Sequence, residues 1–200
     1  MNDSEFYVSV DKNFKNLLDH PAPELLLREN KQLFSKLLLM EGSFNKKKDY
    51  EDFEIAELII LNYLLSKNNK PLLTFNKDPK IKFDHKMEYN GKIITYEVKV
   101  DCLCRKTGNV PFEIQCRGRA SGMYGTDADF VAYVIPLKNI SLIGFVKLEK
   151  ILSVLDENKT SNKYEIHKTG GDPGSNTHNV LIPLNEAKKI FDKVIEVKLL

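Results

Sequence analysis

The dipeptide Asn90-Gly91 constrains this chain more than any other feature of its sequence. It separates two runs, IKFDHKMEY and KIITYEVKVD, in which apolar and polar residues alternate. Asn-Gly favours the two-residue type I′ turn, because both central residues of that turn need a positive φ angle. A two-residue turn also fixes the register, so the numbers of paired residues should sum to 181, which is 90 plus 91.

This register sorts the hairpin side chains into two faces. One face is apolar apart from His85, and it pairs Ile81 with Val100, Phe83 with Val98, His85 with Tyr96 and Met87 with Ile94. The other face is polar, and it pairs Lys82 with Lys99, Asp84 with Glu97 and Lys86 with Thr95. A slip of one residue would mix the two faces. Turn and pattern agree, so we predict an antiparallel hairpin with one buried face.

The remaining segments predict helices around a sheet. Apolar residues recur at helical spacing in 23–40 and 49–66, and the second of these helices is apolar on most sides. Strands are expected at 110–117, 130–136 and 140–146, with one short strand inside the loop-like stretch 161–179. A short helix is expected at 148–155, and the end of a strand followed by a closing helix at 181–194. These elements predict an α/β (α+β) fold, in which helices flank a central mixed sheet that contains the hairpin.

Length and composition set the broad class. Two hundred residues suit one compact body, with a helical extension over 1–48 and a core over 49–200. No run of about 18 apolar residues occurs, and the N-terminus lacks a secretory pattern, so we expect no membrane partner. The net charge of +2 argues against a basic tail protein but is compatible with a nucleic-acid enzyme.

The three cysteines indicate a cytoplasmic, reduced protein. Their number is odd, and Cys102, Cys104 and Cys116 cluster locally. Together with His85 they form an alternative zinc set. A Cys-x-Cys pair on one face of a strand favours buried free thiols instead.

The polar face of the hairpin carries a pattern suited to phosphodiester chemistry. Directly opposed residues have Cβ atoms about 4.5–5.5 Å apart, so Asp84 and Glu97 repel each other unless a cation lies between them. Mg²⁺ binds oxygen ligands of this kind. Lys99 points to the same face and can orient an attacking water. The alternative is the ordinary charged surface of an amphipathic hairpin.

These residues resemble a known family signature. Asp84, twelve intervening residues and Glu97-Val98-Lys99 resemble the motif of PD-(D/E)XK nucleases, and YEVKVD is similar to a strand of Holliday-junction resolvases. Those proteins carry a glutamate on a preceding helix, and FEIAELIILNYL makes Glu57 the candidate. A carboxylate among so many apolar neighbours is costly unless it is paired or binds a metal.

The resemblance implies a restriction-endonuclease-like fold and an enzyme that cleaves DNA, with endonuclease action favoured. Asp84, Glu97 and the carbonyl of Val98 would hold Mg²⁺ or Mn²⁺, and Lys99 would act on the attacking water. Many relatives form homodimers. Phe83 replaces the proline of the motif, and an additional strand follows Glu97-Val98-Lys99. The stretch around that strand is more similar to small phage and bacterial nucleases, so junction specificity is not implied.

Three alternatives stay open from the sequence. Asp101, Glu113 and Gln115 form a rival acid-and-glutamine set, a second metal site, a DNA contact or plain hairpin surface. A group of polar residues near the same end of the sheet suits phosphate binding or is solvated loop, namely Arg105, Lys106, Arg117, Arg119 and Ser121. The alternative function is a catalytically inactive nucleic-acid-binding module on the same fold.

Overall fold

The main sheet of the protein has six strands and mixed pairing. A computed structural model describes residues 23–39, 46–67, 70–71, 82–169 and 176–198. The strands, in spatial order, are β1 (Lys70–Pro71), β2 (His85–Tyr89), β3 (Lys92–Val100), β6 (Phe130–Ile135), β7 (Ile140–Lys147) and β10 (Lys193–Lys198). Only β3 and β6 are parallel, and the other neighbours are antiparallel. This confirms the predicted mixed sheet and α+β class.

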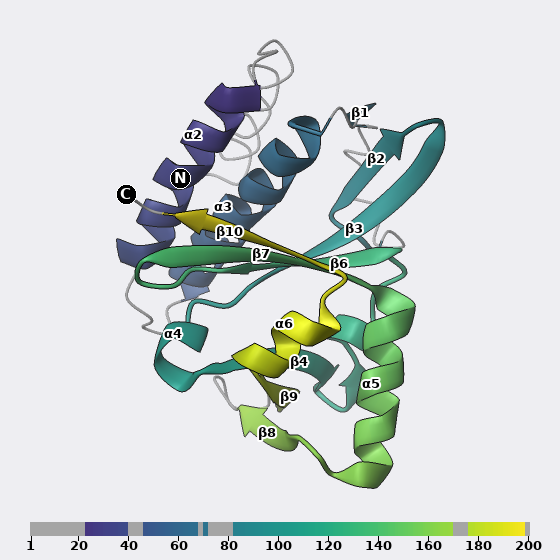
Figure 1. Cartoon of the computed structure of the whole chain (residues 1–200). Helices are drawn as coiled ribbons and strands as arrows, with labels where there is room; N and C mark the ends of the chain where they lie inside the picture. The colour runs from purple at the N-terminus through teal and green to yellow at the C-terminus, as the bar shows by residue number, and fades with distance from the viewer. Residues whose placement is uncertain (1–22, 40–45, 68–69, 72–81, 170–175, 199–200) are drawn as a thin grey trace.

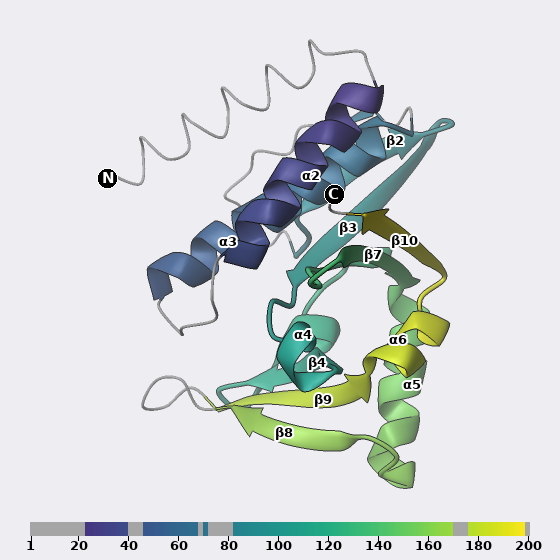
Figure 2. The same cartoon turned by 60° about the vertical axis from the view of Figure 1, so that its left-hand side comes forward.

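In the part of the chain that the structure describes, a second, antiparallel sheet and six helical segments complete the fold. The strands of the second sheet, in spatial order, are β5 (Arg119–Ala120), β4 (Asn109–Cys116), β9 (Thr177–Pro183) and β8 (Glu165–Thr169). The helices are α2 (Pro23–Leu39), α3 (Lys46–Leu65), α4 (Cys104–Thr107), the 3-10 helix η1 (Gly122–Tyr124), α5 (Leu148–Ser161) and α6 (Leu184–Ile190). Figures 1 and 2 show α2 and α3 on one side of the main sheet and the second sheet on the other.

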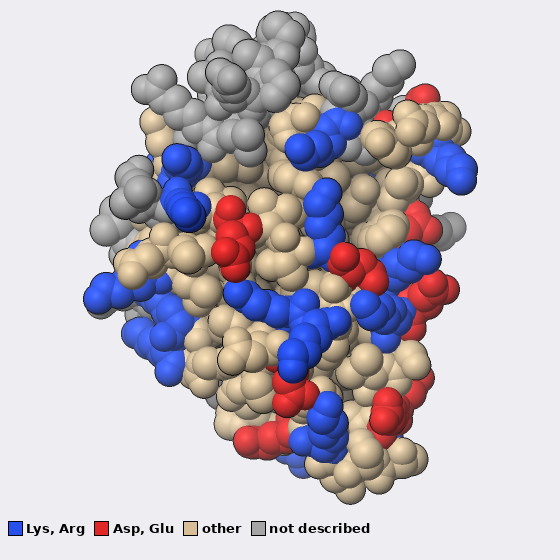
Figure 3. Space-filling model, viewed as in Figure 1, with Lys and Arg blue, Asp and Glu red and all other residues tan. Residues whose placement is uncertain are grey.

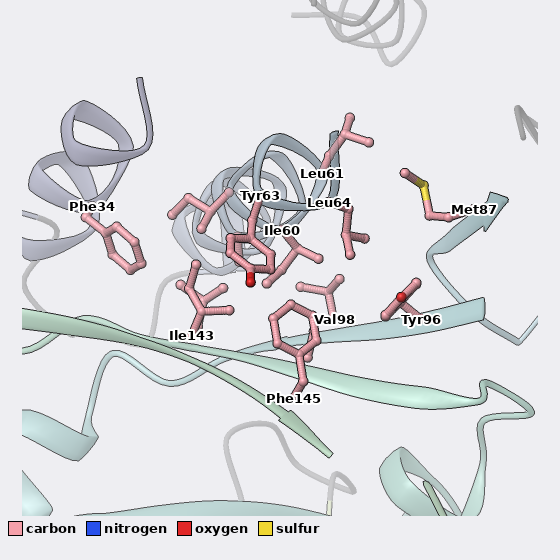
Figure 4. Close-up of a cluster of buried hydrophobic side chains, with 14 of the residues drawn as sticks. Phe34, Ile60, Leu61, Tyr63, Leu64, Met87, Tyr96, Val98, Ile143 and Phe145 are labelled. Carbon is pink, nitrogen blue, oxygen red and sulfur yellow. The ribbon is translucent and has the colours of Figure 1, made fainter. Parts of the chain in front are cut away.

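One hydrophobic core lies between the main sheet and α3. Val98 of β3 and Ile60 of α3 are fully buried there, and Figure 4 shows them close to Phe145 and Tyr63. Helix α3 is apolar on most sides because it packs on the sheet and also against α2, which lies alongside it. A buried polar link joins the two helices, since Asn62 donates to the side chain of Asn30 at 2.9 Å.

A second core fills the space between the two sheets. The ring of Tyr133 on β6 lies 5.0 Å from that of Phe112 on β4, and 5.8 Å from that of Phe191. The hydroxyl of Tyr133 donates to the carbonyl of Pro111 at 2.8 Å, so this buried polar group is satisfied. The packing places the side of β3 and β6 that carries Tyr133 against the second sheet.

The predicted hairpin is confirmed from His85 to the turn. His85 pairs with Tyr96 and Tyr89 pairs with Lys92, so the numbers sum to 181. Asn90 and Gly91 have φ angles of 51° and 75°, as a type I′ turn requires. Ile81 lies outside the described residues.

Other elements depart from the prediction. Helix α3 begins at Lys46 and runs across the expected boundary between residues 48 and 49. Helix α5 is 14 residues long and extends six residues beyond 155. The closing helix α6 is followed by β10, an edge strand that the helical interpretation of 181–194 missed. Strand β4 belongs to the second sheet instead of continuing the hairpin sheet.

Among the described helices, none is long and apolar enough to cross a membrane. All three cysteines are free. The expectation that Cys102 and Cys104 share a strand face was wrong, because β3 ends at Val100 and Cys104 begins α4.

Candidate active site at the open edge of strand β3

Strand β2 stops pairing before β3 ends. The last ladder pair is His85 with Tyr96, whereas β3 continues to Val100. The amide of Asp84 donates to the carbonyl of Tyr96 at 2.9 Å, which is one residue out of the predicted register. The predicted pairs of Lys82 with Lys99, Phe83 with Val98 and Asp84 with Glu97 are therefore not formed. Among the described residues, no strand pairs with the edge of β3 beyond Tyr96 on this side.

Contacts from a distant segment hold the chain where it departs from the ladder. The carbonyl of Lys82 accepts hydrogen bonds from the hydroxyl of Thr126 at 2.6 Å and from the amide of Asp127 at 3.1 Å. The side chains of Lys82 and Asp127 also form an exposed ion pair at 3.5 Å. These contacts hold Lys82 outside the ladder, two residues before Asp84.

The carboxylate of Asp84 takes the place that a continued β2 would fill. Its Oδ2 atom accepts a hydrogen bond from the amide of Val98 at 2.6 Å. In an antiparallel ladder, the N–H and C=O groups of one residue point toward the same neighbouring strand. The Val98 carbonyl therefore points to the same open edge as Asp84. Two of the three metal ligands implied by the family resemblance thus lie side by side.

Glu97 and Lys99 form a half-buried ion pair at this edge. The Nζ atom of Lys99 lies 2.5 Å from Oε1 of Glu97, and the two side chains are 25% and 14% exposed. The same Nζ atom lies 5.7 Å from the ring centroid of Phe53 on α3, a distance that permits a cation–π interaction. Lys99 therefore reaches around the edge of the sheet toward the helix, which the open edge permits.

Helix α3 brings Glu57 to the same place. The Nε2 atom of His85 lies 3.1 Å from the carbonyl oxygen of Glu57 and fastens the helix to the strand. Burial lowers the pKa of His85 to about 4, so its ring is neutral at pH 7 and can donate this hydrogen bond. His85 was the one polar residue on the apolar face of the hairpin, and that anomaly was the signal for this contact.

Burial and mutual repulsion raise the pKa of two carboxyl groups at this site. Burial, and then repulsion from Asp84, Glu54 and Glu97, raise the pKa of Glu57 to about 8, while Lys99 lowers it. Burial and repulsion from Glu97 raise the pKa of Asp84 to about 6, against the lowering effects of the Val98 amide and Lys99. The structure thus brings together all four residues that the sequence singled out. Three carboxyl groups share one lysine, which is a shortage of positive charge.

The donor set fits a hard divalent cation. Among the described side chains, no three or more His, Cys, Asp or Glu residues are grouped to ligate a metal. Mg²⁺, however, usually takes only one or two protein carboxylates and completes its shell with water and substrate phosphate. Asp84, Glu97 and the Val98 carbonyl supply that number of oxygen donors. A cation here would also relieve the repulsion that raises the pKa of Asp84.

The rival set is divided between the two sheets. Oδ1 of Asp101 accepts from the amides of Leu103 and Cys104, at 2.9 and 3.1 Å, and so caps the turn into α4. Glu113 and Gln115 lie on β4 of the second sheet, so they do not share the polar face of the hairpin. The three residues are therefore not a second copy of the hairpin arrangement.

Glu113 nevertheless lies across from the candidate site. Its carboxylate accepts a hydrogen bond from the hydroxyl of Ser121. Burial, followed by the negative charges of Asp101, Glu113 and Glu97, raises the pKa of the Tyr133 hydroxyl well above its ordinary value. The two sets of acids thus flank one buried tyrosine, although their hydrogen bonds differ.

The predicted phosphate-binding residues do not form one cluster. Arg105 lies in α4, where its guanidinium donates to the carbonyl of Leu38 at 2.8 Å and ties α4 to α2. Lys106 is exposed on the same short helix. Arg117 and Arg119 are exposed at the β4–β5 turn, in which Arg117 has a φ angle of 52°. Helix α4 precedes β4 and the β4–β5 turn follows it, so the expectation that these basic residues lie near the same end of the sheet was wrong.

A second Glu-x-Lys sequence shows that the tripeptide alone does not define the site. Glu196, Val197 and Lys198 repeat Glu97-Val98-Lys99 on β10, which is an edge strand of the main sheet, whereas β3 lies inside the sheet. Glu196 there pairs with Lys188 of α6 at 3.2 Å.

Searches for similar proteins found no match among family models, curated proteins or solved structures.

Proposed function

We propose that this chain is a Mg²⁺- or Mn²⁺-dependent nuclease that hydrolyses phosphodiester bonds in DNA on a restriction-endonuclease-like fold. The observation that carries the proposal is the convergence of Glu57, Asp84, Glu97 and Lys99 at the open edge of β3. They come from a helix, from the residue before a strand and from the strand itself. A solvated hairpin surface would not gather buried, mutually repelling carboxyls from three elements.

Each residue has a chemical task in this proposal. Asp84, Glu97 and the Val98 carbonyl would hold the metal, which supplies positive charge for the phosphate and for an activated water. Lys99 is held beside Glu97 and Phe53, where its ammonium can donate to a water or to a phosphate oxygen. Glu57, when it is ionised, would accept a hydrogen bond from a water at this site.

The charge on the face that carries α6 and β10 does not favour that face for DNA binding. Figure 3 shows basic and acidic side chains intermixed over the face that carries α6 and β10. On that face Lys150 pairs with Asp192 at 2.8 Å and Lys163 pairs with Glu186 at 2.8 Å. Such a surface has no extended field of one sign to attract a phosphate backbone.

Association of two copies, which would place two sites on one duplex, stays a prediction.

The test is a cleavage assay with supercoiled plasmid and single-stranded DNA in Mg²⁺, Mn²⁺ or EDTA. We expect metal-dependent cutting by the wild type and a loss of roughly 10²- to 10⁴-fold in Lys99→Ala. Lys198→Ala, in the second Glu-x-Lys sequence, is the matched control and should cut like the wild type. Undiminished cutting by Lys99→Ala would refute the site. Salt-sensitive DNA binding without any cutting by the wild type would favour the inactive binding module.

A further inference from the structure

The segment Thr126–Asp129 contacts the chain on both sides of β3. In the sheet β3 lies between β2 and β6. On the β6 side, the carboxylate of Asp129 accepts from the amide and the hydroxyl of Thr95, at 2.8 and 2.9 Å. On the β2 side, the hydroxyl of Thr126 donates to the carbonyl of Lys82 at 2.6 Å. The segment therefore crosses β3, and we call it the crossing segment.

Thr126 is the fixed point of the crossing segment. Thr126 is buried, with 8% of its surface exposed, and its hydroxyl makes two hydrogen bonds. The oxygen donates to Lys82 and accepts from the amide of Ala128 at 3.2 Å. One hydroxyl thus has both its donor and an acceptor position in use, which holds its orientation.

The consequence falls on Asp84, two residues after Lys82. The carbonyl of Lys82 is held by Thr126 and Asp127, so the chain just before Asp84 is fixed outside the ladder, and the amide of Asp84 donates to Tyr96 out of the predicted register. Only then can the carboxylate of Asp84 accept from the Val98 amide, because a regular strand would direct that side chain away from the ladder. We infer that Thr126 is a positioning residue that places Asp84 at the open edge of β3 for metal binding.

This inference rests on the proposed function for its purpose, but its structural part is measured without metal. The direct readout is hydrogen exchange of the Val98 amide, followed by ¹⁵N NMR on the full chain in EDTA. Thr126→Val keeps the shape and removes the hydroxyl. We expect the Val98 amide to exchange roughly tenfold faster or more in this variant, because its acceptor is no longer held in place.

Matched variants separate positioning from a general loss of stability. Thr126→Ser retains the hydroxyl and should keep wild-type exchange at Val98. Thr107→Val is the control, because the Thr107 hydroxyl also bonds to the main chain, at the Asn109 carbonyl 3.2 Å away, but far along the chain from Lys82. If Thr126→Val fails to fold, Thr126→Ala makes the same test with a smaller side chain. Unchanged exchange at Val98, or an equal rise in the Thr107 control, would overturn the inference.

Metal binding supplies the second readout. Titration with Mn²⁺, followed by calorimetry, should give a dissociation constant roughly tenfold higher in Thr126→Val than in the wild type or Thr126→Ser. Wild-type protein that neither binds Mn²⁺ nor cuts DNA would refute the proposed function while the exchange result still decides the role of Thr126. Wild-type Mn²⁺ affinity in Thr126→Val would overturn the inference and leave the proposed function standing.

Discussion

Replacing Glu57 by glutamine should stabilise the metal-free protein near neutral pH. The pKa of Glu57 is about 8 in the folded chain and 4.5 when it is unperturbed, because burial and the carboxylates of Asp84, Glu54 and Glu97 disfavour its ionised form. The folded state therefore holds the proton more tightly than the unfolded state does. Stability from this group is fully present below pH 4.5 and is lost as the pH rises toward 8.

The size of the effect follows from the pKa difference. One pKa unit corresponds to about 1.4 kcal/mol. Between pH 4.5 and pH 7 the unfolded state ionises at Glu57 while the folded state mostly keeps the proton, so the unfolding free energy falls by about 3 kcal/mol. Glutamine does not titrate. In EDTA at pH 7 we expect Glu57→Gln to unfold about 6–12 °C above the wild type, whereas at pH 4.5 the two should be nearly equal.

Thermal unfolding in EDTA at pH 4.5, 6, 7 and 8 measures this difference. Glu51→Gln, an exposed position on the same helix, is the matched control and should follow the wild type at every pH. The comparison isolates Glu57 because Glu57→Gln keeps every other titrating group of the wild type. Equal pH dependence in wild type and Glu57→Gln would refute the conclusion that this carboxyl is buried among like charges.

Three further outcomes are expected. Mg²⁺ should raise the unfolding temperature of the wild type more at pH 8 than at pH 5. The reason is that protons compete with the metal for Asp84, whose pKa is raised to about 6. Asp84→Asn should abolish this rise in unfolding temperature. Asp101→Ala should cost about 1–2 kcal/mol in denaturant unfolding, since two amides lose their acceptor, yet the folded variant should still cut DNA. Lost cutting would instead favour the rival acids. Gly122→Ala should cost about 1–3 kcal/mol or more, because its φ is +55° and the new Cβ would lie 2.4 Å from the Glu113 carbonyl oxygen.

The sequence predicted correctly those elements that are determined by neighbouring residues in the chain. The Asn90-Gly91 turn and the alternation around it contain their own register, and the structure keeps that register from His85 to Lys92. The edge strand β10 was missed for the opposite reason. Its residues form a short run with weak alternation, and pairing with β7 makes it a strand. Context of this kind often overrides local preference in strands.

The geometry of the candidate site depends on contacts that no local pattern contains. Extrapolating the hairpin register placed Asp84 opposite Glu97 as an ordinary cross-strand pair. In the structure Asp84 instead accepts a hydrogen bond from the main-chain amide of Val98, and Thr126, more than forty residues away, holds the carbonyl of Lys82 nearby in the chain.

The two Glu-x-Lys copies differ for the same reason. Both have glutamate, valine and lysine on a strand of the main sheet, and sequence alone cannot rank them. Around Lys99 the neighbouring strand stops early, an aspartate enters the vacated edge and α3 adds Glu57, whereas Glu196 pairs with a lysine of α6. The chemistry proposed for Lys99 therefore depends on the break in the β2–β3 ladder, and a variant that restored regular pairing at Asp84 should lose metal binding while keeping every proposed site residue.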